Sequence, residues 1–290
     1  MWVLLSLYFA LWAAIYLPIA KKVLKSTSPT IFLFISSIFL IAFMLIALTM
    51  QGSFPHVSNK FLILMFTSAI FDLVAFLLSL WAIKISPISL LAPISSFTPV
   101  FVTFIAMFTL HEIPTSQKLI GILTIVLGSY FLNITDVKNG LLAPFKRLFS
   151  DKGVKLAFIA NFLWGITPVF QKQAIFQTSP IIPLFASFAG VIFVTLFITP
   201  YILKKERKQV LPTIKQNIGW LLVIGFFGTL GQLAAYISFS QTNVGYATAI
   251  FRLSTLFTIL FGAIFFKEKR IYERLLGAII MILGTLLLVL

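Results

Sequence analysis

Two charged residues lie deep within apolar stretches of this chain, where a charge needs either a function or a buried partner. Asp72 stands in SAIFDLVAF and Arg252 stands in TAIFRLSTL. A charge at the centre of a bilayer costs at least about 2.5 kcal/mol, so both are candidate site residues. The carboxylate suits proton coupling or an amine, and the guanidinium suits a carboxylate, phosphate or sulfonate. The alternatives are a hydrogen-bonded structural Asp72 and a structural ion pair between the two residues.

Polar and aromatic residues in other apolar stretches extend the candidate substrate or coupling site. They are Trp12, Tyr16, Ser95, Ser96, Thr98, Trp164, Gln232 and Tyr236, with Asn161 as a further neutral hydrogen-bonding residue. Candidate hinge or cavity residues are Pro18, Pro93, Pro99 and Pro168, because a proline inside a helix frees a backbone carbonyl. The chain holds 33 Phe, so packing is the simpler interpretation of each aromatic residue taken alone.

Chemistry that needs thiols, clustered histidines or a bound nucleotide is not expected. The chain has no Cys and two His, and Asp72 is the only acidic residue deep in an apolar stretch. We therefore expect no metal site, no cofactor and no intramembrane enzyme. A nucleotide-binding glycine loop is also absent, so ATP-driven transport is not indicated.

The elements that must position these residues are predicted to be membrane helices. Of the 290 residues, 60% are hydrophobic and 10% are charged, whereas about 25% of a soluble domain is charged. The apolar runs reach the roughly 20 residues that a helix needs to cross a bilayer, and they do not alternate as barrel strands do. The net charge of +15 sits in short clusters between these runs, which indicates membrane topology and no nucleic-acid partner.

We predict an all-α polytopic membrane protein with ten transmembrane helices. The expected spans are Trp2–Val23, Pro29–Met50, Lys60–Ile83, Pro87–Phe108, Ser116–Asn133, Lys155–Lys172, Pro180–Leu203, Ile214–Ser240, Val244–Phe266 and Tyr272–Leu290.

The spans form two copies of one unit. At an offset of 156 residues, the matched pairs are Glu112 with Glu268, Leu119 with Leu275, Gly121 with Gly277, Leu127 with Leu283, and Gly128 with Gly284. At an offset of 151, Thr27-Ser28-Pro29 falls on Thr178-Ser179-Pro180, so about five residues are inserted, most simply in a basic loop KKERKQVLPT. Five spans per copy reverse the second copy in the membrane, which predicts inverted repeats over 1–134 and 154–290 with a linker at 135–153.

This arrangement resembles the drug/metabolite transporter superfamily and, within it, the EamA family. Each half ends in an acidic residue, a short polar turn and a helix of the form L-x-G-x6-G, and the resemblance covers essentially the whole chain. It implies a secondary transporter or exporter in which the core spans surround a central cavity, while the fifth and tenth spans lie at the periphery. The usual Glu-Arg pair of the family is replaced here by Glu112-Ile113 and Glu268-Lys269. Glu112 and Glu268 precede predicted helices near the membrane edge, so we expect them to be helix caps or gate residues.

We therefore expect a secondary transporter of a small polar or amphipathic metabolite, an amino acid or related compound. It would work by alternating access through a central cavity between the inverted repeats, coupled to a proton or counter-substrate. The alternatives are a lipid-linked carrier flippase and a non-transporting membrane scaffold or sensor. The expected location is the bacterial cytoplasmic (inner) membrane, as a multi-pass protein.

The charge distribution predicts an orientation. Of the 22 Lys and Arg residues, 18 lie at odd-numbered loops; Lys60, Lys118 and Lys172 lie at even-numbered loops, and Arg252 lies within a span. The positive-inside rule then places both termini outside the cytoplasm. The resemblance to the EamA family implies the opposite orientation, with both termini inside.

Overall fold

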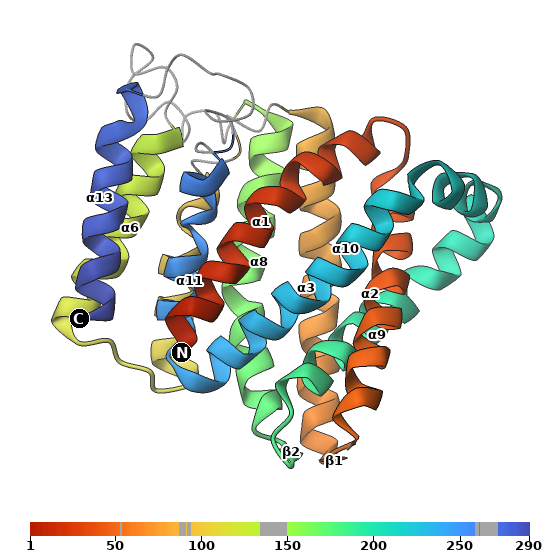
Figure 1. The fold of residues 1–290 in the computed structure, drawn as a ribbon, viewed down its shortest axis with the longest axis horizontal. Helices are drawn as coiled ribbons and strands as arrows, with labels where there is room; N and C mark the ends of the chain where they lie inside the picture. Colours follow the sequence, from red (N-terminus) through yellow and green to blue (C-terminus); the bar gives the residue numbers. More distant parts are fainter. Residues whose placement is uncertain (53, 87–90, 92–93, 134–149, 259–260, 262–271) are drawn as a thin grey trace.

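The chain folds into a bundle of helices (Figure 1) in a computed structural model that describes all residues except 53, 87–90, 92–93, 134–149, 259–260 and 262–271. The described elements, in chain order, are α1 (Trp2–Leu24), α2 (Pro29–Gln51), β1 (His56–Val57), α3 (Asn59–Ile85), α5 (Thr98–Thr109), α6 (Ser116–Asn133), α8 (Lys152–Ile175), β2 (Thr178–Ser179), α9 (Pro183–Tyr201), the π-helix η3 (Ile202–Glu206), α10 (Arg207–Gln241), α11 (Val244–Phe251) and α13 (Tyr272–Val289).

Within the described residues, five continuous helical stretches are long and apolar enough to cross a membrane. They are Trp2–Leu24, Pro29–Gln51, Asn59–Ile85, Lys152–Ile175 and Pro183–Gln241. Shorter apolar helices cover Thr98–Thr109, Ser116–Phe131 and Leu276–Val289. The all-α membrane class follows from these helices, while the fourth and ninth expected spans lie partly outside the described residues. Most of the predicted linker and Glu268 lie outside them too.

One predicted loop is wrong. The segment KKERKQVLPT, expected as a connection, is helical, because α9 continues through η3 into α10 without a break. Its Lys, Glu, Arg and Gln residues are good helix formers, and the π-helical turn provides a bend where a loop was expected. Pro212 is accommodated inside α10. The inserted residues therefore lengthen a helix at the end of the molecule where the chain reverses.

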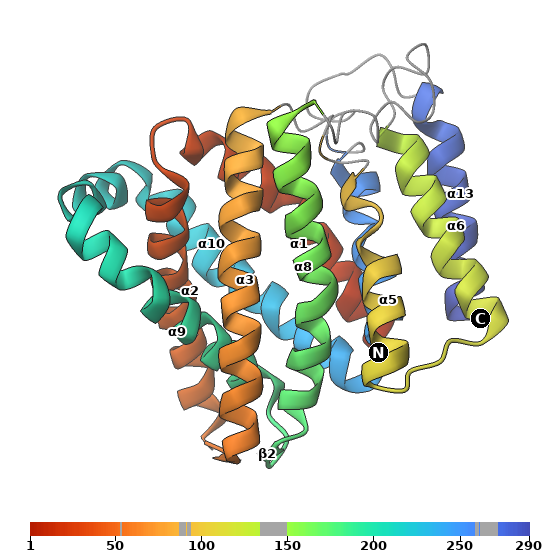
Figure 2. The same ribbon diagram turned by 180° about the vertical axis from the view of Figure 1, so that it is seen from behind.

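Neighbouring helices pair across the two sequence halves. Helix α3 packs along α8, and α6 packs along α13, as the view from behind shows (Figure 2). Glycines allow α6 and α13 to approach closely: a Cβ placed on Gly284 would lie 2.9 Å from the carbonyl oxygen of Gly121. The glycines that the repeat places in equivalent positions thus form a packing seam within the fold.

Two helical segments are interrupted at positions 156 residues apart. Helical hydrogen bonding gives way to turns at Ser96–Phe97 and at Arg252–Leu253. At the first interruption Phe97 N–H donates to the carbonyl of Ile94 at 3.2 Å, and at the second Leu253 N–H donates to Ile250 at 2.9 Å. Both bonds span three residues, so the backbone is tightened in the same way at both places.

A short antiparallel pairing of β1 with β2 joins the connections that follow α2 and α8. His56 is the partner of Ser179, and Val57 is the partner of Thr178. The two Thr-Ser-Pro tripeptides therefore differ in structure, because Ser28 instead caps the first turn of α2 by accepting from Ile31 N–H at 3.2 Å. The sequence match at this point does not extend to the local backbone.

Candidate substrate site between the interrupted helices

Arg252 lies at the carboxyl end of α11, where the helix is interrupted. Its Nη1 donates to the backbone carbonyl of Ser95 at 2.9 Å, and its buried Nε has no hydrogen-bond partner among the residues that the structure describes. Among the described residues, no carboxylate lies within ion-pairing distance of the guanidinium. A buried donor without a partner is costly, so the Arg252 side chain is suited to receive an acceptor that is not part of the described chain.

A hydrogen-bonded cluster around Asn161 of α8 holds the other side of this interruption. Asn161 Nδ2 donates to Ser95 Oγ at 3.1 Å and to the Ala157 carbonyl at 2.7 Å. Asn161 Oδ1 accepts from Thr98 Oγ1 at 2.7 Å. The amide is therefore fully engaged, and it connects α8 to the residue whose carbonyl holds Arg252.

A third hydroxyl group extends the cluster to α6. Ser96 Oγ and Ser129 Oγ are 2.7 Å apart, and Ser129 Oγ and Thr255 Oγ1 are 3.5 Å apart. The residues predicted at the fourth span, Ser95, Ser96 and Thr98, thus lie together with Arg252. Pro99 occupies the first turn of α5, which follows the interruption, whereas Pro93 lies outside the described residues.

Asp72 lies halfway along α3 and turns to α8. Its Oδ2 accepts from Gln171 Nε2 at 2.9 Å and from Ser68 Oγ at 3.4 Å. Thr167 of α8 provides a further side-chain hydrogen bond to the carboxylate. Gln171 and Thr167 were not singled out from the sequence, although their spacing of four residues places them on one face of a helix.

The structure does not contain the ion pair between Asp72 and Arg252 that was considered as an alternative. Asp72 is held by neutral groups of α3 and α8, and Arg252 is held by the carbonyl of Ser95. On α8, Thr167 bonds Asp72, and Asn161 bonds Ser95, the residue that holds Arg252. Thr167 and Asn161 are six residues apart, which corresponds to about 9 Å along a helix. The two charges therefore define two separate polar points along α8.

Of the aromatic candidates of the first span, Trp12 packs against the second half of the chain and Tyr16 against residues of the first half. The Trp12 ring stacks near Phe227 of α10, with ring centroids 6.2 Å apart. A Cβ on Gly231 would meet Trp12 Cδ1 at 2.6 Å, so this glycine makes room for the indole. Tyr16 contacts both Trp12 and Phe32. These contacts place Trp12 and Tyr16 at the packed contact between α1, α2 and α10.

The remaining aromatic and amide candidate residues lie on α8 and α10. Tyr236 of α10 is buried and interacts electrostatically with Asp72, and Gln232 lies half-buried one turn before it. Trp164 of α8 packs edge-on against Phe76 of α3, with centroids 5.3 Å apart. Of the helix-interior prolines, Pro168 is buried next to Thr167, whereas Pro18 of α1 is exposed.

A charged contact that was not predicted joins the two halves at one end of the bundle. Glu112 Oε1 lies 2.5 Å from Lys172 Nζ, and Glu112 Oε2 accepts from the backbone N–H of Val244 at 2.8 Å. Lys172 Nζ also donates to the Thr242 carbonyl at 2.6 Å. Glu112 was expected to be a helix cap or a gate residue, and its carboxylate caps the first turn of α11, a helix of the second half.

Long apolar helices, two helix interruptions and charged groups inside the bundle together indicate a polytopic membrane protein with a polar interior. This class includes carriers of small molecules. The model of the EamA-like transporter family matches residues 1–134 and 151–290. The chain belongs to this family, which makes it a multi-pass membrane transporter of the drug/metabolite superfamily.

Comparison with individual proteins adds the fold. A search of curated proteins finds no match. A solved structure titled "Crystal structure of protein" superposes with a TM-score of 0.75, covering 100% of this chain and 98% of that chain at 12% sequence identity. This likeness extends over the whole chain and shows that the fold is shared.

Proposed function

We propose that this protein is a secondary transporter in which Arg252 binds the anionic group of a small metabolite, such as the carboxylate of an amino acid or a related compound. The observation that carries the proposal is the buried Nε of Arg252, which has no hydrogen-bond partner in the described part of the chain. Irregular backbone within a membrane is tolerated where it is buried in protein or lines a water-filled cavity. Because the helix interruption carries the permanently charged guanidinium of Arg252, it favours a binding site for an anionic group.

In the proposed site, the guanidinium of Arg252 is oriented so that it can bind an oxyanion. One guanidinium nitrogen is fixed by the Ser95 carbonyl, which orients the planar group, while Nε is available. Arginine binds carboxylates through two parallel N–H donors, so a fixed guanidinium loses little entropy on binding.

Asp72 is proposed as the coupling residue and not as part of the anion site. Its carboxylate sits at mid-depth among neutral donors, where protonation changes the local charge without disturbing an ion pair. Carboxylates in such positions commonly relay protons in transporters. The separation of about 9 Å between the two points along α8 allows substrate and proton to bind at the same time.

Alternating access is proposed to use the two sequence halves as ten helices in inverted repeats. The matched interruptions at Ser96–Phe97 and Arg252–Leu253 support this repeat, because the same backbone hydrogen bonds recur at the same offset. The Glu112–Lys172 contact, which bridges the halves at one end, is the candidate gate. The proposed setting is the bacterial cytoplasmic membrane, with uptake or export as the physiological direction.

The test is a thermal-shift screen of the purified protein followed by counterflow in proteoliposomes. Amino acids, organic acids, nucleotide sugars, polyamines and lipophilic cations form the screen. We expect stabilisation by an anionic or zwitterionic class, lost in Arg252→Met and partly kept in Arg252→Lys. The matched control is Arg207→Met, because Arg207 is exposed at the start of α10. Counterflow that is unchanged in Arg252→Met would remove this residue from the site.

A further inference from the structure

A cavity lies between α2, α3, α9 and η3, apart from the site at Arg252. Its volume is about 540 Å³, and it is lined by Ser28, Thr30, Leu73, Leu77, Trp81, Phe197, Ile198, Tyr201 and Glu206. Two of the lining residues, Trp81 and Tyr201, are 44% and 49% exposed on the outer, apolar surface of the bundle. The cavity therefore opens sideways, toward the bilayer.

The cavity is amphipathic along its length. Its apolar wall follows α3 from Trp81 to Leu73, eight residues or about 12 Å along the helix. Leu73 adjoins Asp72 at the middle of α3, so the wall ends at about half the depth of the bundle. The polar residues gather at the other end, where α2 begins and η3 ends.

The polar end offers hydroxyl groups and a carboxylate in one hydrogen-bonded series. Thr30 Oγ1 donates to Glu206 Oε2 at 2.5 Å, and the hydroxyls of Thr30 and Ser28 are 2.9 Å apart. No lysine or arginine of the described residues lies within ion-pairing distance of Glu206, although the surrounding end of the molecule is basic. This half-buried carboxylate is therefore open to a cation from outside the chain.

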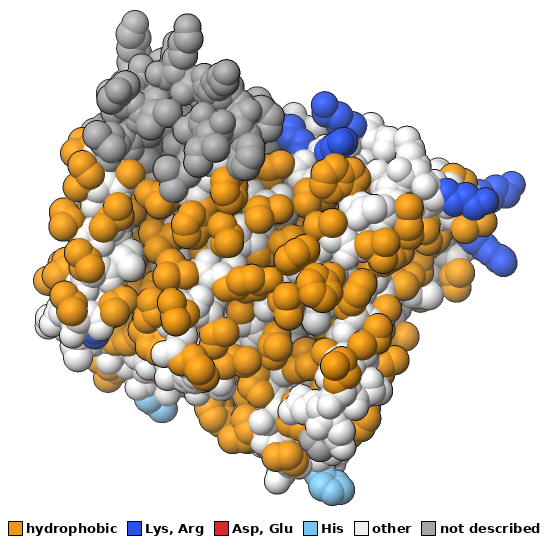
Figure 3. All heavy atoms as spheres, viewed as in Figure 1, with side chains coloured by type: hydrophobic (Ala, Val, Ile, Leu, Met, Phe, Trp, Pro, Cys, Tyr) orange, Lys and Arg blue, Asp and Glu red, His pale blue; other side chains and the backbone are white. Residues whose placement is uncertain are grey.

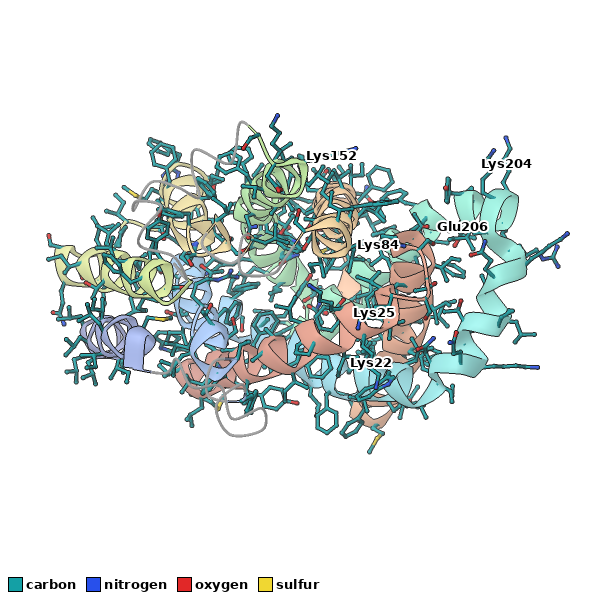
Figure 4. All side chains as sticks on the ribbon, turned by 90° about the horizontal axis from the view of Figure 1, so that it is seen from above. Lys22, Lys25, Lys84, Lys152, Lys204 and Glu206 are labelled. Carbon is teal, nitrogen blue, oxygen red and sulfur yellow. The ribbon has the colours of Figure 1, made fainter. Side chains whose placement is uncertain are left out.

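The ammonium group of Lys84 lies beside two residues that line the same cavity, Ser28 and Trp81. Lys84 Nζ donates to the Thr27 carbonyl at 3.0 Å, next to the Ser28 cap, and lies 5.9 Å from the ring centroid of Trp81. Lys84 contacts Thr27 and Glu206 contacts Thr30, so both lie beside the start of α2; the view from above labels them (Figure 4). The rim thus carries one positive and one negative group beside an apolar wall.

We propose that this cavity binds a membrane phospholipid whose headgroup carries a phosphate and a primary ammonium, as phosphatidylethanolamine does. The ammonium donates to Glu206, the phosphate faces Lys84, and an acyl chain covers the wall from Trp81 to Leu73. A choline headgroup has no N–H to donate, so it satisfies the carboxylate less well.

The lateral opening favours a lipid over a water-soluble amine, because the cavity is reached from exposed aromatic side chains that face the bilayer. The wall ends halfway along α3, so the cavity suits a lipid that stays in one leaflet. This lipid site rests on contacts that are independent of Arg252, and its test can fail without affecting the proposed transport.

The experiment compares dioctanoyl-phosphatidylethanolamine, dioctanoyl-phosphatidylcholine and dioctanoyl-phosphatidylglycerol as ligands of the purified protein, with thermal unfolding and native mass spectrometry as readouts. We expect the ethanolamine lipid to bind at least about tenfold more tightly than the choline lipid, because only the ethanolamine ammonium can donate a charged hydrogen bond to Glu206. Glu206→Gln should remove this preference. Lys204→Gln, a charge change at an exposed residue of the same π-helical turn, should keep it.

Three outcomes would overturn the lipid site. They are equal binding of the ethanolamine and choline lipids, a preserved preference in Glu206→Gln, and full competition by dodecylamine, which would identify a free amphipathic amine as the occupant. If Glu206→Gln does not fold, tryptophan quenching by brominated-acyl phosphatidylethanolamine replaces it. Trp81→Phe should then lower the quenching, and quenching equal to that of the wild-type protein would contradict the site.

Discussion

The carboxylate of Glu112 lies 2.5 Å from the ammonium of Lys172 and at the same time caps the first turn of α11 through Val244 N–H. Glu112 belongs to the first half of the chain, and Lys172 and Val244 belong to the second. Both charged side chains are largely buried, at 10% and 16% exposure. A single carboxylate therefore connects three segments that must separate if this end of the bundle opens.

Glu112→Gln is expected to increase opening at this end. Hydrogen bonds to charged groups contribute about 1.5–3 kcal/mol, which corresponds to at least about a tenfold change in the opening equilibrium. The chain has no Cys, so Thr248→Cys, one turn inside the contact and buried, is a clean reporter. Its labelling by a membrane-impermeant maleimide should rise at least about tenfold in the Glu112→Gln background.

The control for this measurement is Lys118→Gln. Lys118 lies at the same end but donates to the Leu288 carbonyl and takes no part in the Glu112 contact. Labelling that rises equally in both variants would mean that the loss of any charge at this end of the bundle increases its opening. Labelling unchanged in Glu112→Gln would show that the contact does not hold the end closed.

Asp72→Asn is expected to separate coupling from binding. The amide keeps a hydrogen-bonding group next to Gln171 and Ser68 but can no longer take up and release a proton. Transport driven by a pH gradient should be lost, whereas substrate counterflow, which needs no net proton movement, should persist. Glu206→Gln is the matched control, since Glu206 lies away from α8, and its gradient-driven transport should be retained. Gradient-driven transport by Asp72→Asn would exclude Asp72 as the coupling residue.

Asn161 is expected to position the anion site through Ser95. Asn161→Ala leaves the hydroxyls of Ser95 and Thr98 without their amide partner, at a cost of about 1–3 kcal/mol. Because Arg252 is held by the Ser95 carbonyl, KM for the substrate should rise about tenfold while the maximal rate changes less. Asn217→Ala is the control, because Asn217 is also buried but bonds to Thr213 within its own helix. Equal effects of the two variants on KM would indicate a general loss of stability.

The close contact of α6 and α13 can be tested with two glycines. A Cβ on Gly284 would lie 2.7 Å from the backbone nitrogen of Ile125, whereas a Cβ on Gly219 meets nothing within 4 Å. Overpacking costs about 1–3 kcal/mol, so Gly284→Ala should lower the thermal stability of the purified protein, and Gly219→Ala should not. Equal melting temperatures for Gly284→Ala and the wild-type protein would show that the two helices can move apart at little cost.

The membrane class and the family could be predicted because hydropathy and internal repetition are properties of the sequence itself. The location of Asp72 within a helix followed in the same way, whereas Arg252, expected inside the ninth span, lies at the interruption that follows α11. Their partners did not follow from the sequence, since Gln171 is 99 residues from Asp72 and Ser95 is 157 residues from Arg252, and only the packing of α3 and α5 against α8 and α11 brings them together.

The error about local structure has a physical cause. The basic segment KKERKQVLPT carries the charges and the proline of a loop, yet its residues are helix formers and the chain continues as a helix. For Glu112 the sequence predicts a cap or a gate residue but not its partner. That partner, the backbone N–H of Val244, lies 132 residues away in the chain.

The orientation in the membrane follows from where the charges lie on the folded chain. Most Lys and Arg side chains visible in Figure 3 gather at one end, and the visible His side chains lie at the other. Lys21 and Lys22 are in the last turn of α1, so the amino terminus of that helix points to the end opposite the lysines. If the basic end faces the cytoplasm, both termini lie outside it, as the positive-inside rule predicts.

A pair of fusions at the carboxyl terminus tests this orientation. Alkaline phosphatase, which folds only outside the cytoplasm, should be active after Leu290, and green fluorescent protein should be dark there. The matched control places the same reporters after Lys205, within the basic end, where the pattern should reverse. A fluorescent fusion at Leu290 would place the basic end outside, against the charge bias. In that case the Glu112–Lys172 contact would be the cytoplasmic gate, and the lipid cavity would open into the outer leaflet.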